Sequence, residues 1–161
     1  MTKKQIDNIL FGIGVDSLNR FETFLNLMPK VKGKGYWYAL RNSYDMSDNL
    51  FRFKGLVRSA FLKDESDREY LMTKSERNYF RNLPERLTIY RGMTQKEQKT
   101  KSFGVSWTLK KEVAEFFAFK YKRNYHTNHL KKVVCQKKIA KADVIAFIND
   151  RKEYEIIYVG H

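Results

Sequence analysis

The chain has 161 residues, of which 42% are apolar and 15% aromatic, so it can bury a packed core and is not a disordered polypeptide. Its single cysteine, Cys135, excludes an intrachain disulfide and fits a reducing compartment. The sequence shows neither the apolar stretch of a transmembrane helix nor that of a signal peptide. We therefore expect a soluble, cytoplasmic protein that makes no use of a membrane.

The net charge of +14 is distributed unevenly along the chain. Residues 96–141 contain 13 Lys/Arg and 3 Glu, a balance of +10. A basic surface attracts nucleic acid, anionic nucleotides or an acidic protein. An ordinary solvated, lysine-rich surface explains the same charge equally well.

The first part of the chain, residues 1–84, is predicted to be helical. Asp16 or Ser17 can cap a helix whose apolar residues recur at helical spacing until Pro29 stops it. Residues 36–44 and 50–62 are predicted to form two further helices rich in aromatic side chains.

The end of the helical part is marked by two signals. Thr73 is followed three residues later by Glu76, the pattern of a capping box for a short helix, and Pro84 closes this part. Beyond Pro84 the apolar period changes from that of a helix to that of a strand. Strands are predicted at 87–91, 103–107, 132–139, 143–148 and 154–159.

One helix is expected among these strands, at residues 109–121. Thr108 is a suitable N-cap, and Glu112 lies in the first turn, where a negative charge is favourable. The buried face is predicted to consist of Val113, Phe116, Phe117, Ala118 and Tyr121.

The order of elements predicts an α+β protein. A helical N-terminal half, 1–84, would pack on a mostly antiparallel β half, 85–161. We found no repeat and no break in composition that would divide the chain, so residues 1–161 are expected to form one domain.

Three polar groups stand on three predicted strands. Arg91-Gly92 ends the first of these strands, and Ser106-Trp107-Thr108 ends the second. Glu153-Tyr154-Glu155 begins the last one, where strand alternation would place the two carboxylates on one side.

In this order, Tyr90-Arg91-Gly92, Ser106-x-Thr108 with the helix Val-Ala-Glu-Phe-Phe-Ala, and Glu153-x-Glu155-Ile-Ile resemble the arginine-serine-glutamate class of ADP-ribosyltransferases. The resemblance covers residues 85–160. It implies a β-sandwich of ADP-ribosyltransferase type, with residues 85–161 as an NAD-binding catalytic core and residues 1–84 as its helical support.

The resemblance also implies a role for each group. Glu155 would stabilise the cation-like ribose that forms when the bond to nicotinamide breaks, and Glu153 would orient and deprotonate the acceptor. Arg91 would hold the diphosphate side of NAD+, and Gly92 would allow the backbone to approach the nicotinamide amide. Ser106 would bind the ribose or position Glu155.

Two neighbours of Ser106 complete the expected site. Thr108 would support the serine, and Trp107 stands where the family commonly has a threonine. Because alternation puts the indole on the face opposite Ser106, Trp107 is also a candidate core residue.

The resemblance implies a mono-ADP-ribosyltransferase that moves ADP-ribose from NAD+ to a macromolecule and releases nicotinamide without a metal. The Glu-x-Glu pattern favours a protein arginine as acceptor. The basic surface would suit an acidic or nucleic-acid-associated host protein, with nucleic acid as a further partner. A compact, lysine-rich enzyme of this kind would suit a phage effector in the host bacterial cytosol.

The alternative is a basic module without enzymatic activity that binds nucleic acid or an acidic protein. Arg91 would then be a strand-end arginine in an ion pair, and the two glutamates the solvent face of an edge strand. His126 and His129 lie in a polar loop with no third ligand candidate nearby, so a zinc site is not expected there.

Overall fold

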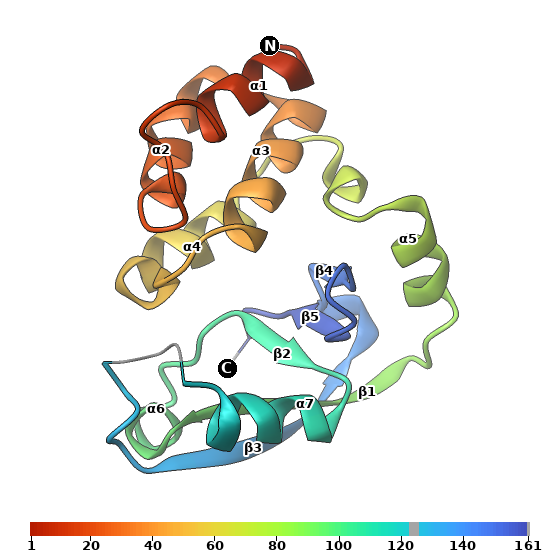
Figure 1. Cartoon of the computed structure of the whole chain (residues 1–161). Helices are drawn as coiled ribbons and strands as arrows, with labels where there is room; N and C mark the ends of the chain where they lie inside the picture. Colours follow the sequence, from red (N-terminus) through yellow and green to blue (C-terminus); the bar gives the residue numbers. More distant parts are fainter. Residues whose placement is uncertain (123–125, 161) are drawn as a thin grey trace. The chain divides into compact units, whose positions relative to one another are not determined.

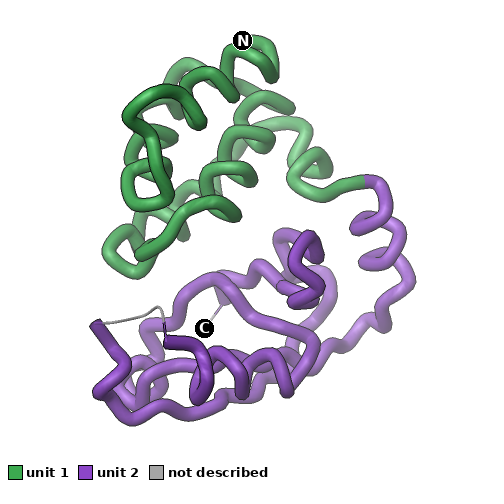
Figure 2. Tube along the Cα trace, viewed as in Figure 1, with its two compact units in different colours: residues 1–73 green, residues 74–161 purple. Residues whose placement is uncertain are grey.

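The computed structural model describes residues 1–122 and 126–160, which form two compact units. One unit comprises residues 1–73 and the other residues 74–161 (Figure 2). The helix over residues 74–81, which lies in the part expected to be helical support, belongs to the second unit.

The first unit is helical, as the apolar spacing predicts (Figure 1). Its core is built from aromatic side chains, among them Phe21, Phe24, Tyr36 and Trp37, each at most 1% exposed. Its helices are α1 (Lys3–Leu10), α2 (Arg20–Leu27), α3 (Gly33–Asp45) and α4 (Lys54–Phe61), with 3-10 turns η1 (Met28–Lys30), η2 (Leu50–Phe53) and η3 (Arg68–Leu71).

Helix α2 begins later than the sequence suggested. The Asp16 carboxylate accepts hydrogen bonds from the backbone N–H groups of Leu18 and Asn19, so it stabilises a turn that precedes the helix. At the other end, Pro29 lies in the 3-10 turn that follows α2, which agrees with its expected role as a stop.

The second unit combines short helices with five strands. Its elements are α5 (Lys74–Arg81), β1 (Arg86–Thr94), α6 (Gln95–Thr100), β2 (Ser106–Thr108), α7 (Lys111–Glu115), the π-helix η4 (Phe116–Lys120), β3 (Lys132–Ala140), η5 (Lys141–Asp143), β4 (Ala146–Ile148) and β5 (Glu155–Ile157). The α+β class with antiparallel strands is therefore confirmed.

The strands described by the structure form one sheet in the order β3-β1-β2-β5-β4, whereas a β-sandwich was expected. The sheet is nearly interrupted in its middle. β1 and β3 pair over nine residues, but β1 and β2 pair only at Tyr90 and Thr108. Continuing that register would place Gly92 opposite Ser106, and no ladder pair forms there. The two strands therefore separate beside these residues.

Helix α6 was not predicted from the sequence. Residues 95–100 include no buried side chain, so they show no apolar period that would indicate a helix. The helix begins because the Thr94 hydroxyl accepts the Glu97 backbone N–H as an N-cap.

The helix expected at 109–121 is shorter, and its cap differs. Lys110 is the N-cap residue of α7, while the Thr108 hydroxyl accepts the Lys110 backbone N–H just before the helix. After five residues the α-helix becomes a π-helix, in which the Tyr121 N–H donates to the Phe116 carbonyl. Ala114 is the buried residue of α7, and Phe116, two residues later in the helix, points to the other side. Phe116 is therefore 46% exposed and does not join the expected buried face.

Candidate functional site

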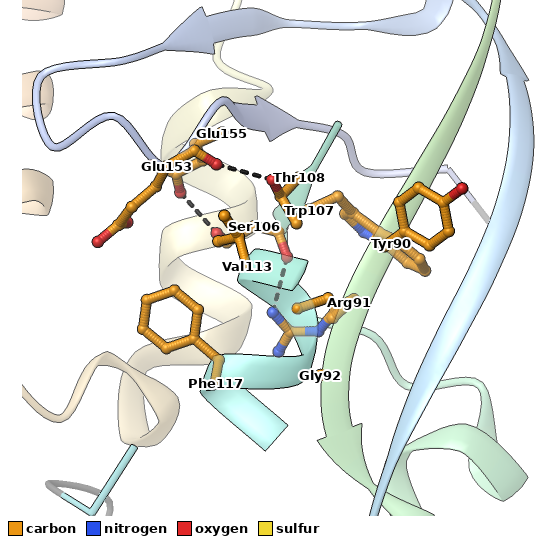
Figure 3. Close-up of a pocket in the computed structure, with 11 residues that line it drawn as sticks. Tyr90, Arg91, Gly92, Ser106, Trp107, Thr108, Val113, Phe117, Glu153 and Glu155 are labelled. Atoms are coloured by element: carbon orange, nitrogen blue, oxygen red, sulfur yellow. Dashed lines mark hydrogen bonds between the residues drawn. The ribbon is translucent and has the colours of Figure 1, made fainter. Parts of the chain in front are cut away.

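All seven residues that the sequence singles out line one pocket of about 180 Å³ in the second unit. They are Arg91, Gly92, Ser106, Trp107, Thr108, Glu153 and Glu155. Tyr90, Val113, Ala114 and Phe117 complete the lining (Figure 3). Residues from β1, β2, α7, η4, the start of β5 and the loop before it therefore surround a single space.

Glu155 and Ser106 are joined directly across two neighbouring strands. Glu155 pairs with Thr108 in the sheet, and Ser106, two residues before Thr108, faces the same side of it. The Ser106 hydroxyl donates to Oε1 of Glu155 at 2.6 Å, a short bond to an acidic side chain (Figure 3). The serine thereby fixes the direction in which this carboxylate points.

Arg91 fills the place where β1 and β2 separate. Its Nη1 donates to the Ser106 carbonyl at 2.8 Å. Its Nε donates to Oε1 of Glu97 at 2.8 Å in an ion pair whose side chains are only 21% and 16% exposed. The guanidinium thus connects β1, β2 and α6, and it places a cation beside the serine that holds Glu155.

Glu97 was not among the residues that the sequence singled out. Its Oε1 accepts the Gly104 N–H at 3.0 Å as well as Arg91 Nε, so one carboxylate holds both the arginine and the chain entering β2. The pattern Thr94-x-x-Glu97 is a helix-start signature that could have directed attention to α6. It would not have indicated that the carboxylate points to Arg91.

Glu153 reaches the pocket from a loop, because β5 begins only at Glu155. The expected strand alternation is therefore not the reason why the two glutamates lie together. Lys152 and Tyr154, on either side of Glu153, both have left-handed backbone conformations, with φ of 56° and 49°. The Thr108 hydroxyl donates to the Glu153 carbonyl at 2.7 Å, so Thr108 supports the loop (Figure 3).

The carboxyl group of Glu153 is perturbed by its surroundings. Burial raises the pKa of Glu153 above its usual value, and the nearby negative charge of Glu155 raises it further. Arg151 acts in the opposite direction and lowers this pKa. Glu153 therefore holds a proton more readily than an exposed glutamate does, as a general base with a raised pKa would.

Gly92 has a packing role that the sequence did not reveal. A Cβ at this position would lie 2.4 Å from the Ala114 carbonyl oxygen and 2.7 Å from the Ala118 backbone nitrogen. The absence of a side chain therefore lets α7 and η4 lie directly against β1. This packing brings Val113 and Phe117 to the pocket as its apolar wall.

Trp107 lines the pocket yet is only 2% exposed. Its ring makes edge-on contacts with Phe103 and Tyr158, at centroid distances of 5.4 and 6.3 Å. Core packing, the alternative for this residue in the sequence, therefore accounts for most of its surface.

Two further properties concern metals and membranes. In residues 1–122 and 126–160, no three His, Cys, Asp or Glu side chains gather in a group that could hold a metal ion. None of the helices in these same ranges combines the length and the apolar character that a membrane crossing requires.

Comparisons of the chain with protein-family models, with curated proteins and with solved structures found no match. The geometry of the pocket is thus the basis for inferring a function.

Proposed function

We propose that the chain is a mono-ADP-ribosyltransferase that transfers ADP-ribose from NAD+ to a macromolecular acceptor. The observation that carries the proposal is the connected set Arg91, Ser106 and Glu155. The arginine binds the serine carbonyl, and the serine hydroxyl binds the glutamate, all at one pocket. A carboxylate fixed before the reaction suits a transition state that carries positive charge.

The reaction breaks the bond between ribose C1′ and the nicotinamide nitrogen, and nicotinamide leaves as a neutral ring with the bonding electron pair. Glu155 stabilises the cation-like ribose that forms, as a carboxylate does in glycoside cleavage. The acceptor nucleophile then forms a bond to C1′ and gives its proton to Glu153, whose raised pKa suits this task.

The dimensions of the site limit which part of NAD+ it encloses. A cavity of about 180 Å³ is smaller than the roughly 300–1,000 Å³ of pockets that bury a drug-sized ligand. It suits the nicotinamide and its ribose, between Phe117 and Glu155. The diphosphate then lies toward Arg91, which is paired with Glu97 and offers the planar N–H groups of a guanidinium to an anionic group.

The positive charge of the second unit indicates which kind of acceptor would bind it. Residues 74–161 contain 20 Lys/Arg and 9 Asp/Glu, a net charge of +11 out of the total of +14. Such a surface favours an acidic or nucleic-acid-associated protein as the target, and the pair Glu153 and Glu155 favours an arginine of that protein as the acceptor.

The test is to incubate the pure protein and its Glu155→Gln variant with labelled NAD+ and bacterial lysate. We expect labelled protein and free nicotinamide with the wild type, and a rate lower by about 10²–10³-fold with the variant, because an electrostatic contact to the transition state is lost. Glu112→Gln, an exposed position on α7 outside the pocket lining, serves as the matched control and should retain activity.

Other outcomes have distinct meanings. Nicotinamide release without labelled protein indicates hydrolysis or an absent acceptor, and label on nucleic acid identifies a different acceptor class. If no NAD+ is consumed with several lysates, the proposal is wrong. The high charge of the second unit then favours the alternative, a binding module for nucleic acid or an acidic protein.

A further inference from the structure

The loop of residues 149–154, here called the Glu153 loop, is held by α5. Glu76 of this helix is 5% exposed, and its Oε1 accepts the Asn149 backbone N–H at 2.8 Å. Tyr79, one helical turn further on, stacks on Phe147 at a centroid distance of 4.6 Å and meets the Tyr154 ring edge-on at 6.0 Å. One face of α5 therefore contacts both ends of the loop.

Asn149, whose backbone is held by Glu76, in turn binds two residues at the other end of the loop. Its side-chain Oδ1 accepts the Tyr154 N–H at 3.0 Å, and its carbonyl accepts the Lys152 N–H at 3.0 Å. These two bonds fix the two residues whose backbones are left-handed. Because non-glycine residues adopt that conformation only where surrounding contacts impose it, the loop depends on these bonds.

The opposite side of the loop is held by β2 and the residue that follows it. The Thr108 hydroxyl binds the Glu153 carbonyl, and the Leu109 N–H donates to the Tyr154 carbonyl at 3.1 Å. The backbone on both sides of the Glu153 side chain is thus fixed.

Glu155 is held in a different way. It lies in β5, where its backbone pairs with both Thr108 and Ile148, and its carboxylate accepts a hydrogen bond from the Ser106 hydroxyl. The two carboxylates of the pocket therefore have separate supports, although only one residue lies between them. A change in the anchor at Asn149 can displace Glu153 while Glu155 keeps its place.

We propose that Glu76 and Asn149 are positioning residues that set the place of Glu153, and thereby the share of ADP-ribose that reaches the acceptor and not water. This inference rests on the proposed function. Glu155 acts on the bond to nicotinamide, a step common to transfer and hydrolysis, whereas Glu153 acts on the acceptor alone. Loosening the Glu153 loop should therefore affect transfer more than hydrolysis.

The experiment compares Asn149→Ala, which removes the acceptor of the Tyr154 N–H, with Asn149→Asp, which retains an oxygen there. Label on the acceptor protein measures transfer, and nicotinamide release without acceptor measures hydrolysis. We expect Asn149→Ala to lower transfer by about 10–100-fold, as a misplaced catalytic group does, with the smaller effect on hydrolysis. Asn149→Asp should restore most of the transfer.

The same comparison applies to Glu76. Glu76→Gln retains an oxygen for the Asn149 N–H and should behave like the wild type, whereas Glu76→Ala should behave like Asn149→Ala. If Glu76→Ala does not fold, the Asn149 pair alone decides. An equal decrease of transfer and hydrolysis in Asn149→Ala would show that the anchor is merely structural and would overturn the inference.

Two measurements that require no enzymatic activity test the positioning of Glu153 separately from the proposed function. Amide hydrogen exchange of Tyr154 should accelerate in Asn149→Ala and not in Asn149→Asp. The pKa of Glu153, followed by NMR, should fall toward its usual value in Asn149→Ala, because the opened loop buries Glu153 less and moves it away from Glu155. Unchanged exchange and an unchanged pKa would contradict the positioning role, even if the wild type consumed no NAD+. Absence of NAD+ turnover would contradict the proposed function and with it the effect on transfer, whereas the exchange and pKa measurements alone decide whether Asn149 positions Glu153.

Discussion

At Gly104 the space that a side chain would occupy is taken by the guanidinium of Arg91. A Cβ there would lie 2.5 Å from Nη2 and 2.9 Å from Cζ of Arg91. The Gly104 N–H also binds the Glu97 carboxylate that holds the arginine. Gly104 thus helps to hold the Arg91 guanidinium in place, although it does not line the pocket.

We predict that Gly104→Ala displaces Arg91 from the Ser106 carbonyl while the protein still folds, because the atom it strikes is the end of a flexible side chain. The displaced Arg91 would no longer reach the diphosphate of NAD+. Losing that hydrogen bond of a charged group costs about 1.5–3 kcal/mol, so NAD+ should bind at least tenfold more weakly. Calorimetric titration with NAD+ measures this. Gly55→Ala, where a Cβ would meet nothing within 4 Å, is the control.

Two outcomes would contradict this prediction. NAD+ affinity equal to that of the wild type would show that Arg91 does not contribute to binding from its present place. Loss of the folded state, measured by urea denaturation, would show that the position has a structural role larger than the displaced guanidinium explains.

At the scale of elements, the wall of the pocket depends on the contact between β1 and the helical segment α7–η4. Gly92 permits this contact, and the atoms closest to its missing side chain are the backbone atoms of Ala114 and Ala118. Backbone atoms of a helix cannot move individually as a side chain can. The whole segment would have to shift to admit a methyl group.

We therefore predict that Gly92→Ala lowers the free energy of unfolding by about 1–3 kcal/mol, the usual cost of overpacking. It should also lower nicotinamide release, because Val113 and Phe117 move with the segment. Urea denaturation and the NAD+ assay measure the two effects. Normal stability with normal activity would show that the segment adapts without disturbing the pocket.

The sequence allowed the longer elements of this unit to be predicted, and the short polar ones less well. The prediction for β3, 132–139, is within one residue of the observed bounds, because this run is rich in residues that favour strands. The prediction for β1, 87–91, follows the alternating apolar side chains but stops at Gly92, whereas the strand continues to Thr94 in its pairing with β3. Helix α6 was missed because polar helices held by a cap and an ion pair have no apolar period. The change to a π-helix at Phe116 likewise has no periodic signal.

For the candidate site, the sequence predicted which residues meet but not always why. Arg91, Ser106 and Glu155 meet because they lie on three neighbouring strands of one sheet, Arg91 within β1 and the other two at the starts of β2 and β5. The sequence indicated this through the order of its motifs, although it placed Arg91 at the end of its strand and β1 in fact continues to Thr94. Glu153 reaches the same pocket through two left-handed residues, which nothing in a Lys-Glu-Tyr sequence indicates. Glu97, Glu76 and Asn149 act through long-range contacts, and their partners are visible only in three dimensions.

At the scale of the whole molecule, the charge is divided unequally between the two units. Residues 1–73 carry 12 Lys/Arg and 9 Asp/Glu, a net charge of +3, whereas residues 74–161 carry +11. The unit with the candidate site is therefore the strongly basic one. Some of its lysines have internal roles, such as Lys141, which donates to two backbone carbonyls. Others, including Lys131 and Lys138, are exposed.

If this charge attracts an acidic acceptor, transfer should depend on salt. We predict that the KM for the acceptor rises as salt is raised from about 50 to 500 mM, because screening shortens the range of attraction to a few Å. The kcat should change less, since Glu155 and Ser106 are joined by a short, direct bond inside the pocket. Steady-state transfer at several salt concentrations provides both constants.

Charge-reversal variants show which lysines attract the acceptor. Lys131→Glu with Lys138→Glu should raise the KM at low salt and flatten its salt dependence, because both side chains are exposed in the basic unit. Lys4→Glu with Lys30→Glu, equally exposed but in the unit of low net charge, changes the total charge by the same amount. If the two double variants behave alike, only the net charge of the molecule matters. If neither changes the KM, the lysines are a solvated surface, and the acceptor is recognised by the rim of the pocket itself.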